Sequence, residues 1–111
     1  FKDGFFVVVD SSGLIVAYAI LAFTQNMGYV LSIAVQPKNR NQGYANALLE
    51  FLEGKCREKG VPNLRLDVRS TNTAAIGLYK KLGLTELQIK KDFYGKGVDA
   101  LSMGKTVTSM L

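Results

Sequence analysis

Hydrophobic residues in the first third of the chain follow the pattern of β-strands. The stretch GFFVVVDSSGLIVAYAILAF has two apolar runs on either side of DSSG, whose residue types favour a turn. We expect strands over 5–10 and 14–23, joined as a hairpin. After a second turn at TQNMG, the run YVLSIAV predicts a third strand over 29–35, and its almost wholly apolar composition indicates burial on both faces. Pro37 cannot donate to a sheet ladder and helps to end this strand.

The hydrophobic period changes to that of a helix over residues 41–59. Gly60 then provides a C-cap signal, and Pro62 prevents the helix from continuing. We expect an amphipathic helix that packs on a sheet, with Cys56 as a core residue. Its apolar stripe consists of Tyr44, Ala47, Leu48, Phe51, Leu52 and Cys56.

The remaining sequence predicts a strand, a second helix and two more strands. In NLRLDVR, apolar residues alternate with charged ones, as in a strand with one buried face. STN then offers a helix cap, and Gly83 ends the helix. LTELQIK and VDALSMGKTV predict the final strands, on either side of the glycine-rich DFYGKG. The apolar stripe of the second helix is Ala75, Ile76, Tyr79 and Leu82.

The resulting order is β-β-β-α-β-α-β-β. The strand–helix–strand unit over 29–68 predicts a right-handed crossover between two parallel strands, and the other connections resemble hairpins. The expected fold class is therefore α/β (α+β), with a mixed, mostly antiparallel sheet and flanking helices. A chain of 111 residues suits one domain, over residues 1–111.

Composition narrows the possible partners. The chain is 48% hydrophobic and 21% charged, as in soluble globular proteins, and its interrupted apolar runs predict neither a membrane span nor a signal peptide. We therefore expect a cytoplasmic protein. The net charge of +5 indicates either solubility or an anionic partner such as a phosphorylated cofactor. Because the basic residues are scattered, we expect neither nucleic acid nor membrane as a partner.

The residue counts also limit the chemistry. The chain has no histidine and a single cysteine, Cys56, so no internal disulfide and no Ser-His, Cys-His or zinc-His arrangement can form. A general base must be Asp, Glu, Tyr, Lys or water, and we expect no metal.

The loop RNQGYA, before the long helix, is a candidate anion site. A helix N-terminus offers unpaired N–H groups and partial positive charge, and Gly43 permits close approach of the backbone. Neither a Walker A loop nor a dinucleotide fingerprint is present. From the residues alone, a strand, loop and helix of this kind are more often plain scaffolding than a phosphate site.

The stretch SIAVQPKNRNQGYANALLEF resembles the acetyl-coenzyme A motif of the GNAT superfamily of N-acetyltransferases, with the loop pattern [QR]-x-x-G-x-[GA] at Arg40, Gly43 and Ala45. RLDVRSTNTAAIGLYKKLGL and IKKDFYGKGVDALSM are similar to segments of the RimI-like ribosomal-protein alanine and archaeal N-terminal acetyltransferases. The resemblance covers roughly residues 29–107. It implies a GNAT fold with a splayed pair of central parallel strands.

The resemblance implies acetyl-CoA as cosubstrate. The strand before the loop would pair with the pantetheine arm, and a backbone N–H from Val35 would act as an oxyanion donor. The loop would hold the pyrophosphate, mainly through main-chain N–H groups. Asn72 would contact the arm of the cofactor, or serve as a helix N-cap. The implied cofactor-binding residues are Ile33, Ala34, Val35, Arg40, Asn41, Gln42, Gly43, Tyr44, Ala45, Asn46 and Asn72.

The resemblance also implies two catalytic residues and an acceptor site. Tyr79 would be the general acid toward the departing thiolate, although its place on the apolar stripe also suits core packing. Asp67 occupies the position of a family glutamate that acts as the base; the alternative is a strand Asp paired with an arginine at 65 or 69. Phe93 and Tyr94 would line the peptide groove.

The implied function is transfer of an acetyl group to a protein N-terminal α-amine, in a ribosomal protein for example, by direct attack. One alternative is a GNAT enzyme that acetylates a small-molecule amine or lysine, and another is a non-catalytic CoA-binding module. Related proteins usually have two helices ahead of the first hairpin, so we expect the domain to be N-terminally truncated or reduced.

Overall fold

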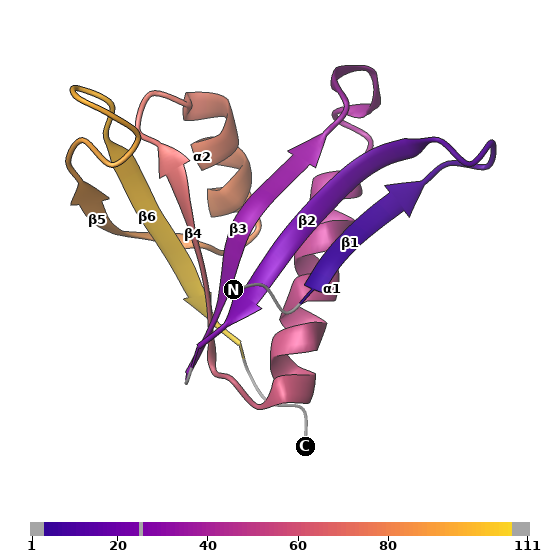
Figure 1. The fold of residues 1–111 in the computed structure, drawn as a ribbon, viewed down its shortest axis with the longest axis horizontal. Coiled ribbons are helices and arrows are strands. Elements are labelled where there is room, and N and C mark those ends of the chain that lie inside the picture. Colours follow the sequence, from indigo (N-terminus) through magenta and orange to yellow (C-terminus); the bar gives the residue numbers. More distant parts are fainter. Residues whose placement is uncertain (1–3, 25, 108–111) are drawn as a thin grey trace.

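The computed structural model describes residues 4–24 and 26–107, within which six strands, two α-helices and one 3₁₀ turn are found (Figure 1). Their order agrees with the sequence prediction, apart from the added 3₁₀ turn. Gln25, in the second expected turn, lies outside the described residues. The elements are β1 (Gly4–Val9), β2 (Ile15–Phe23), β3 (Met27–Val35), the 3₁₀ turn (Pro37–Asn39), α1 (Tyr44–Lys59), β4 (Asn63–Arg69), α2 (Thr73–Lys81), β5 (Thr85–Lys90) and β6 (Ala100–Thr106).

The described strands form one mixed sheet in the order β1-β2-β3-β4-β6-β5. β3 and β4 are parallel, and the other neighbouring strands are antiparallel. A parallel pair needs a crossover connection, which α1 provides. The predicted mixed sheet with one central parallel pair is therefore confirmed.

The two parallel strands separate halfway along their length. Their pairing begins at Met27 opposite Asn63 and ends at Val30 opposite Leu66. On the other side of β3, the register with β2 shifts between Val30 and Ser32, so that Leu31 is the extra residue of a β-bulge. A bulge bends its strand, and beyond it β3 and β4 diverge (Figure 1). The splayed pair that the family resemblance implied is thus present.

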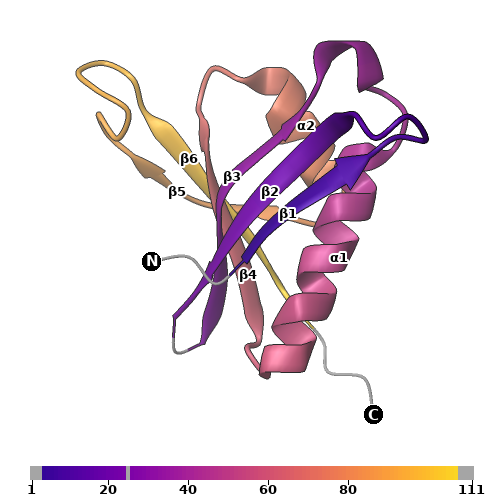
Figure 2. The same ribbon diagram turned by 45° about the vertical axis from the view of Figure 1, so that its right-hand side comes forward.

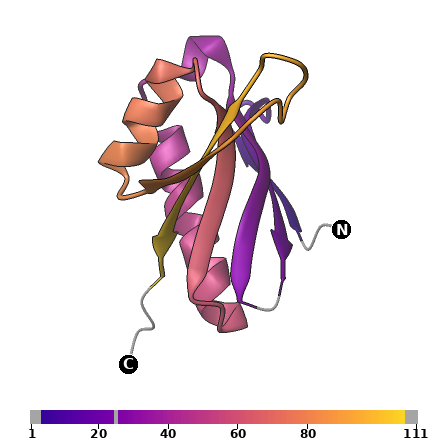
Figure 3. The same cartoon turned by 90° about the vertical axis from the view of Figure 1, so that its left-hand side faces the viewer.

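Both helices lie on the same face of the sheet (Figures 2 and 3). The core between them and the sheet is well packed; Leu52 and Cys56 of α1 and Leu64 of β4 are fully buried there. Burying a leucine side chain in this way contributes about 1.5–3 kcal/mol. This packed core holds both helices against the sheet and so fixes the direction of their N-termini. Within the described residues, no helix is long and apolar enough to cross a membrane.

The expectation that β3 is buried on both faces is wrong. Val30 is buried under the helices, but Leu31 is 49% exposed and Tyr29 is only half-buried. Among the described elements, helices cover one face of the sheet only. The apolar composition of β3 therefore reflects one buried face and one open face, rather than a strand covered on both sides.

The predicted stripe of α1 needs corrections at three positions, one of which is Ala47, an exposed residue. The helix begins at Tyr44 rather than at 41, and its buried face includes Leu49, which the stripe omitted. Phe51, expected in the core, is 46% exposed. Its ring instead meets that of Phe6 on β1 at a centroid distance of 5.0 Å. The helix thus presents Phe51 to the edge of the sheet, beside the core.

Candidate functional site

A cavity of about 420 Å³ lies between the end of β3, the start of α1 and α2. The three elements meet here because β3 has diverged from β4 and the N-termini of both helices lie at this end of the sheet (Figure 1). The residues that line the cavity are Ile33, Ala34, Val35, Arg40, Asn41, Gly43, Ala45, Asn46, Asn72, Ala74, Ala75, Leu78 and Tyr79.

The first turn of α1 permits an anion to approach the backbone closely. Gly43 precedes the helix with φ of 86°, and Asn41 has φ of 64°. Glycine adopts this left-handed conformation without steric cost. No side chain caps the first turn, so its N–H groups point outward with the positive end of the helix dipole. This arrangement suits a phosphate group.

Two side chains of the loop bond back to the chain. The Arg40 Nε donates to the carbonyl of Val35 at 3.2 Å, which leaves the terminal amino groups of Arg40 available beside the cavity. The Gln42 Nε2 donates to the carbonyl of Lys38 at 3.4 Å. Gln42 does not line the cavity, and neither does Tyr44, which packs against the core. Their side chains therefore shape the loop rather than the cavity wall.

Two predicted residues of α2 face the same cavity. The Asn72 Oδ1 accepts a hydrogen bond from the Ala75 N–H at 3.2 Å, so Asn72 is the N-cap of the helix. Tyr79 is 9% exposed, and its hydroxyl forms no hydrogen bond within the described part of the chain. Burial, and secondarily the nearby Tyr94, raise the pKa of Tyr79. The phenol therefore stays protonated and able to donate a proton.

Asp67 lies on the open face of the sheet. Its side chain is only 3% exposed, and its Oδ2 pairs with the Nζ of Lys90 on β5 at 3.2 Å. The alternative role considered for Asp67 was a structural one, paired with an arginine at 65 or 69; among the described residues its ion-pair partner is Lys90 instead. β6 lies between β4 and β5, with Ser102 opposite Asp67 and Ala100 opposite Lys90. Because these two β6 residues are small, the lysine reaches across the strand.

The predicted aromatic pair lies in the β5–β6 loop next to this carboxylate. The rings of Phe93 and Tyr94 meet edge to face at 5.0 Å, and the Arg69 guanidinium carbon lies 5.3 Å from the centre of the Tyr94 ring. Burial, then the negative charge of Asp67, raise the pKa of Tyr94, and Arg69 opposes this. Tyr94 also raises the pKa of Tyr79. It therefore interacts electrostatically both with Asp67, on the open face of the sheet, and with Tyr79, on the face that the helices cover.

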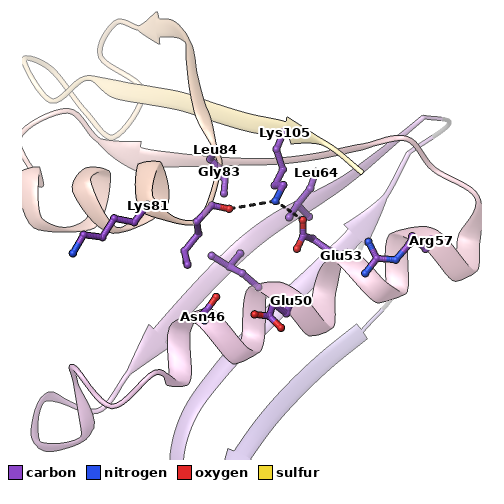
Figure 4. A pocket seen from close by; sticks show the side chains of 11 residues that line it. Asn46, Glu50, Glu53, Arg57, Leu64, Lys81, Gly83, Leu84 and Lys105 are labelled. Atoms are coloured by element: carbon purple, nitrogen blue, oxygen red, sulfur yellow. Dashed lines mark hydrogen bonds and ion pairs between the residues drawn. The ribbon is translucent and has the colours of Figure 1, made fainter. Parts of the chain in front are cut away.

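A second, larger cavity of about 690 Å³ lies between α1, the end of α2 and β6 (Figure 4). The Nζ of Lys105 pairs with Glu53 at 2.6 Å and donates to the Leu82 carbonyl at 3.2 Å. Lys105 thereby ties the end of α2 to α1. Asn46 is the only predicted site residue in the lining, and this cavity lies away from Tyr79. The smaller cavity, which Tyr79 lines, is therefore the candidate site.

The smaller cavity gathers most of the predicted site, and the aromatic pair and Asp67 lie apart from its lining. Sequence reasoning missed three lining residues of α2, Ala74, Ala75 and Leu78, of which Leu78 lies at helical spacing from Ala75. It also missed Lys90, for which no local signal exists because the contact depends on strand order. The predicted residues that line the cavity are Ile33, Ala34, Val35, Arg40, Asn41, Gly43, Ala45, Asn46, Asn72 and Tyr79.

Comparisons with known proteins by sequence and by structure both identify acetyltransferases. Residues 1–84 match the acetyltransferase (GNAT) family. The [ribosomal protein bS18]-alanine N-acetyltransferase of Escherichia coli (strain K12) is 39% identical over 86 residues, which are 78% of this chain. This chain spans 58% of that relative's length.

Solved structures share the fold. The crystal structure of the ribosomal-protein-S18-alanine N-acetyltransferase from Escherichia coli aligns with a TM-score of 0.81 and 33% identity, over 96% of this chain and 70% of that one. Nourseothricin acetyltransferase aligns with a TM-score of 0.90 and 26% identity, over 94% and 65%. With a family match that covers most of its length and a sheet that splays at the expected strand pair, this chain belongs to the GNAT family of acetyltransferases.

Proposed function

We propose that this protein is an N-acetyltransferase that transfers the acetyl group of acetyl-CoA to the α-amine of a protein N-terminus. The observation that carries the proposal is the smaller cavity, in which residues from β3, α1 and α2 meet at the splay. It combines a helix terminus suited to an anion with the hydroxyl of Tyr79, a largely buried residue whose hydroxyl has no hydrogen bond within the described residues.

Two parts of acetyl-CoA would bind along the cavity. Its pyrophosphate would lie at the first turn of α1, near Gly43 and Arg40, and the pantetheine arm along the end of β3. The N–H of Val35 would stabilise negative charge on the thioester oxygen as the bond to the acceptor forms. Asn72 would bond to the arm through its side-chain amide, since its Oδ1 caps α2.

The acceptor amine would attack the thioester carbon directly, and the thiolate would leave with a proton from Tyr79. Asp67 would take the proton of the amine. The demand on this base is modest, because an α-amine has a pKa near 7.7–8.0 and is partly neutral at pH 7. Phe93 and Tyr94 would line the path of the acceptor.

The first acceptor to test is a peptide from the N-terminus of a ribosomal protein, because the Escherichia coli relatives are named for alanine of bS18. The experiment combines calorimetry of acetyl-CoA binding with release of free CoA. The peptides begin with Ala, Ser, Met or Gly. We expect micromolar binding and turnover with at least one peptide. Absence of any CoA affinity in the full-length protein would overturn the proposal.

A second candidate is acetylation of a small-molecule amine, which the alignment with nourseothricin acetyltransferase favours. Polyamines and aminoglycosides tested beside the peptides separate the two. Turnover with these amines and none with peptides would select the second candidate. Binding without turnover, unaffected by Tyr79→Phe, would indicate a CoA-binding module instead.

A further inference from the structure

The carboxylate of Asp67 is almost fully buried on the open face of the sheet. One oxygen, Oδ2, accepts a bond from the Lys90 Nζ at 3.2 Å. The other, Oδ1, is buried and has no hydrogen-bond partner among the described residues. Leaving a charged, buried oxygen unpaired costs folding free energy. A buried, unpaired carboxylate oxygen of this kind is a candidate for a functional role.

Lys90 is itself held by three separate parts of the chain. Its Nζ lies 5.1 Å from the centre of the Phe93 ring and 6.0 Å from that of Tyr29. Both distances are within the range of cation–π attraction. Its backbone pairs with Ala100 of β6. The ammonium is therefore confined between a carboxylate and two aromatic rings.

The other ionisable groups around Asp67 do not replace this contact. Arg69, on the same strand, places its guanidinium over the ring of Tyr94, and Arg65 has no ion pair within the described residues. Tyr94 is an uncharged phenol whose raised pKa keeps it so near neutral pH. Lys90 is thus the cation that bonds to Asp67 in the described chain.

We propose that Lys90 is a positioning residue for the base: by binding Oδ2 it keeps the buried Asp67 ionised and leaves Oδ1 to receive the proton of the acceptor amine. A buried carboxylate without a nearby cation becomes protonated at higher pH. This inference rests on the proposed function for the catalytic step, whereas the control of Asp67 ionisation stands on the contact itself.

The test compares Lys90→Met, Lys90→Arg and Lys91→Met in the full-length protein. Lys91 is the adjacent exposed lysine, without an ion pair in the described chain, so its variant controls for loss of net charge. The first readout is the acid limb of the pH profile of kcat/KM. We expect Lys90→Met to move this limb up by about one pH unit or more. At any fixed pH on the acid limb, kcat/KM should fall about tenfold for each unit of this shift, with acetyl-CoA affinity unchanged.

Lys90→Arg should have an acid limb close to that of the wild type, because arginine keeps the positive charge beside Asp67. Lys91→Met should have the same pH profile of kcat/KM as the wild type. A wild-type profile for Lys90→Met, or a lower KM for the acceptor in that variant, would overturn the inference. The lower KM would mean that Lys90 competes with the acceptor amine for Asp67.

The second readout does not need activity. Carbon-13 NMR follows protonation of the Asp67 carboxyl in wild type and Lys90→Met, with circular dichroism to confirm folding. We expect the midpoint to be about one pH unit or more higher in the variant. An unchanged midpoint would overturn the inference. A shifted midpoint in a protein without any acetyl transfer would instead reject the proposed function and leave the ionisation control in place.

Discussion

Val30 and Leu66 form the last pair of the parallel ladder between β3 and β4, and both side chains are buried in the core. Directly after Val30 comes Leu31, the extra residue of the bulge, whose side chain is half exposed. The cavity thus begins where a well-packed pair ends. The packed core supports the site. The bulge bends β3, and the cavity lies where β3 and β4 then diverge.

The first prediction concerns this boundary. Leu66→Ala should lower the free energy of unfolding by about 2–4 kcal/mol, because it leaves a cavity in the core. Leu31→Ala, one residue beyond the ladder on β3, should change it by less than about 1 kcal/mol. Urea denaturation of both variants measures the difference, and equal costs would contradict the packing described for Val30 and Leu66.

The second prediction concerns the loop before α1. Gly43→Ala places a Cβ on a residue with φ of 86°, so it should destabilise the protein by about 1 kcal/mol and weaken acetyl-CoA binding several-fold. Gly54→Ala is the matched control. Gly54 lies inside α1, and a Cβ there meets no atom within 4 Å. That variant should gain about 0.5–1 kcal/mol and bind normally. Equal acetyl-CoA affinities for the two variants would argue against a phosphate at Gly43.

The third prediction concerns Gly28 and Cys56. A Cβ on Gly28 would lie 2.5 Å from the Cys56 Sγ, which is fully buried. Gly28→Ala should therefore cost about 1–3 kcal/mol through overpacking. Adding Cys56→Ala removes the sulfur and should recover much of this loss. A double variant whose cost equals the sum of the single costs would show that the two sites do not compete for space.

The fourth prediction follows from the ionisation of Cys56. Burial, with a smaller contribution from Glu53, raises the pKa of its thiol from 9.0 to about 11. The unfolded chain releases this proton first, so the stabilising effect is complete below pH 9 and is lost as pH rises toward 11. The loss should be about 1–3 kcal/mol. Unfolding curves at pH 8 to 11 measure it, and Cys56→Ala should show a shallower decline. The same slope in both proteins would contradict the burial effect.

The fifth prediction concerns Tyr79. Loss of a general acid lowers rates by about 10²–10⁴-fold, so Tyr79→Phe should reduce kcat by about 10²-fold while acetyl-CoA binding stays within about threefold. Because the pKa of Tyr79 is raised, the high-pH limb due to this group should lie above pH 10. A Tyr79→Phe variant with full kcat would remove Tyr79 from the mechanism.

Much of the fold could be predicted because local signals agree with it. The glycine at 60 ends α1 in the left-handed conformation, Asn72 caps α2, and the alternation over 63–69 matches the burial of β4. Most residues of the cavity lie in two short stretches, and the resemblance of these stretches to GNAT motifs predicted them; the residues alone indicated only a candidate anion site at the loop before α1. These features depend on neighbours in the sequence.

The errors concern contacts between distant segments. Phe51 fits the apolar period of α1, but whether its side chain is buried depends on β1 being the edge strand of the sheet, and the sequence of α1 does not encode this. The Asp67–Lys90 pair depends on β6 lying between β4 and β5, which no pattern within either strand encodes. The bulge at Leu31 likewise arises from the register with β2.

Binding of acetyl-CoA in the cavity at the splay of β3 and β4 can be followed by titrating the nitrogen-15-labelled protein with acetyl-CoA and recording amide chemical shifts. We expect saturable shifts concentrated over residues 33–46 and 72–79, which Gly43→Ala weakens. Shifts centred instead on the larger cavity, around Glu53 and Lys105, or no shifts at millimolar acetyl-CoA, would contradict binding at the splay.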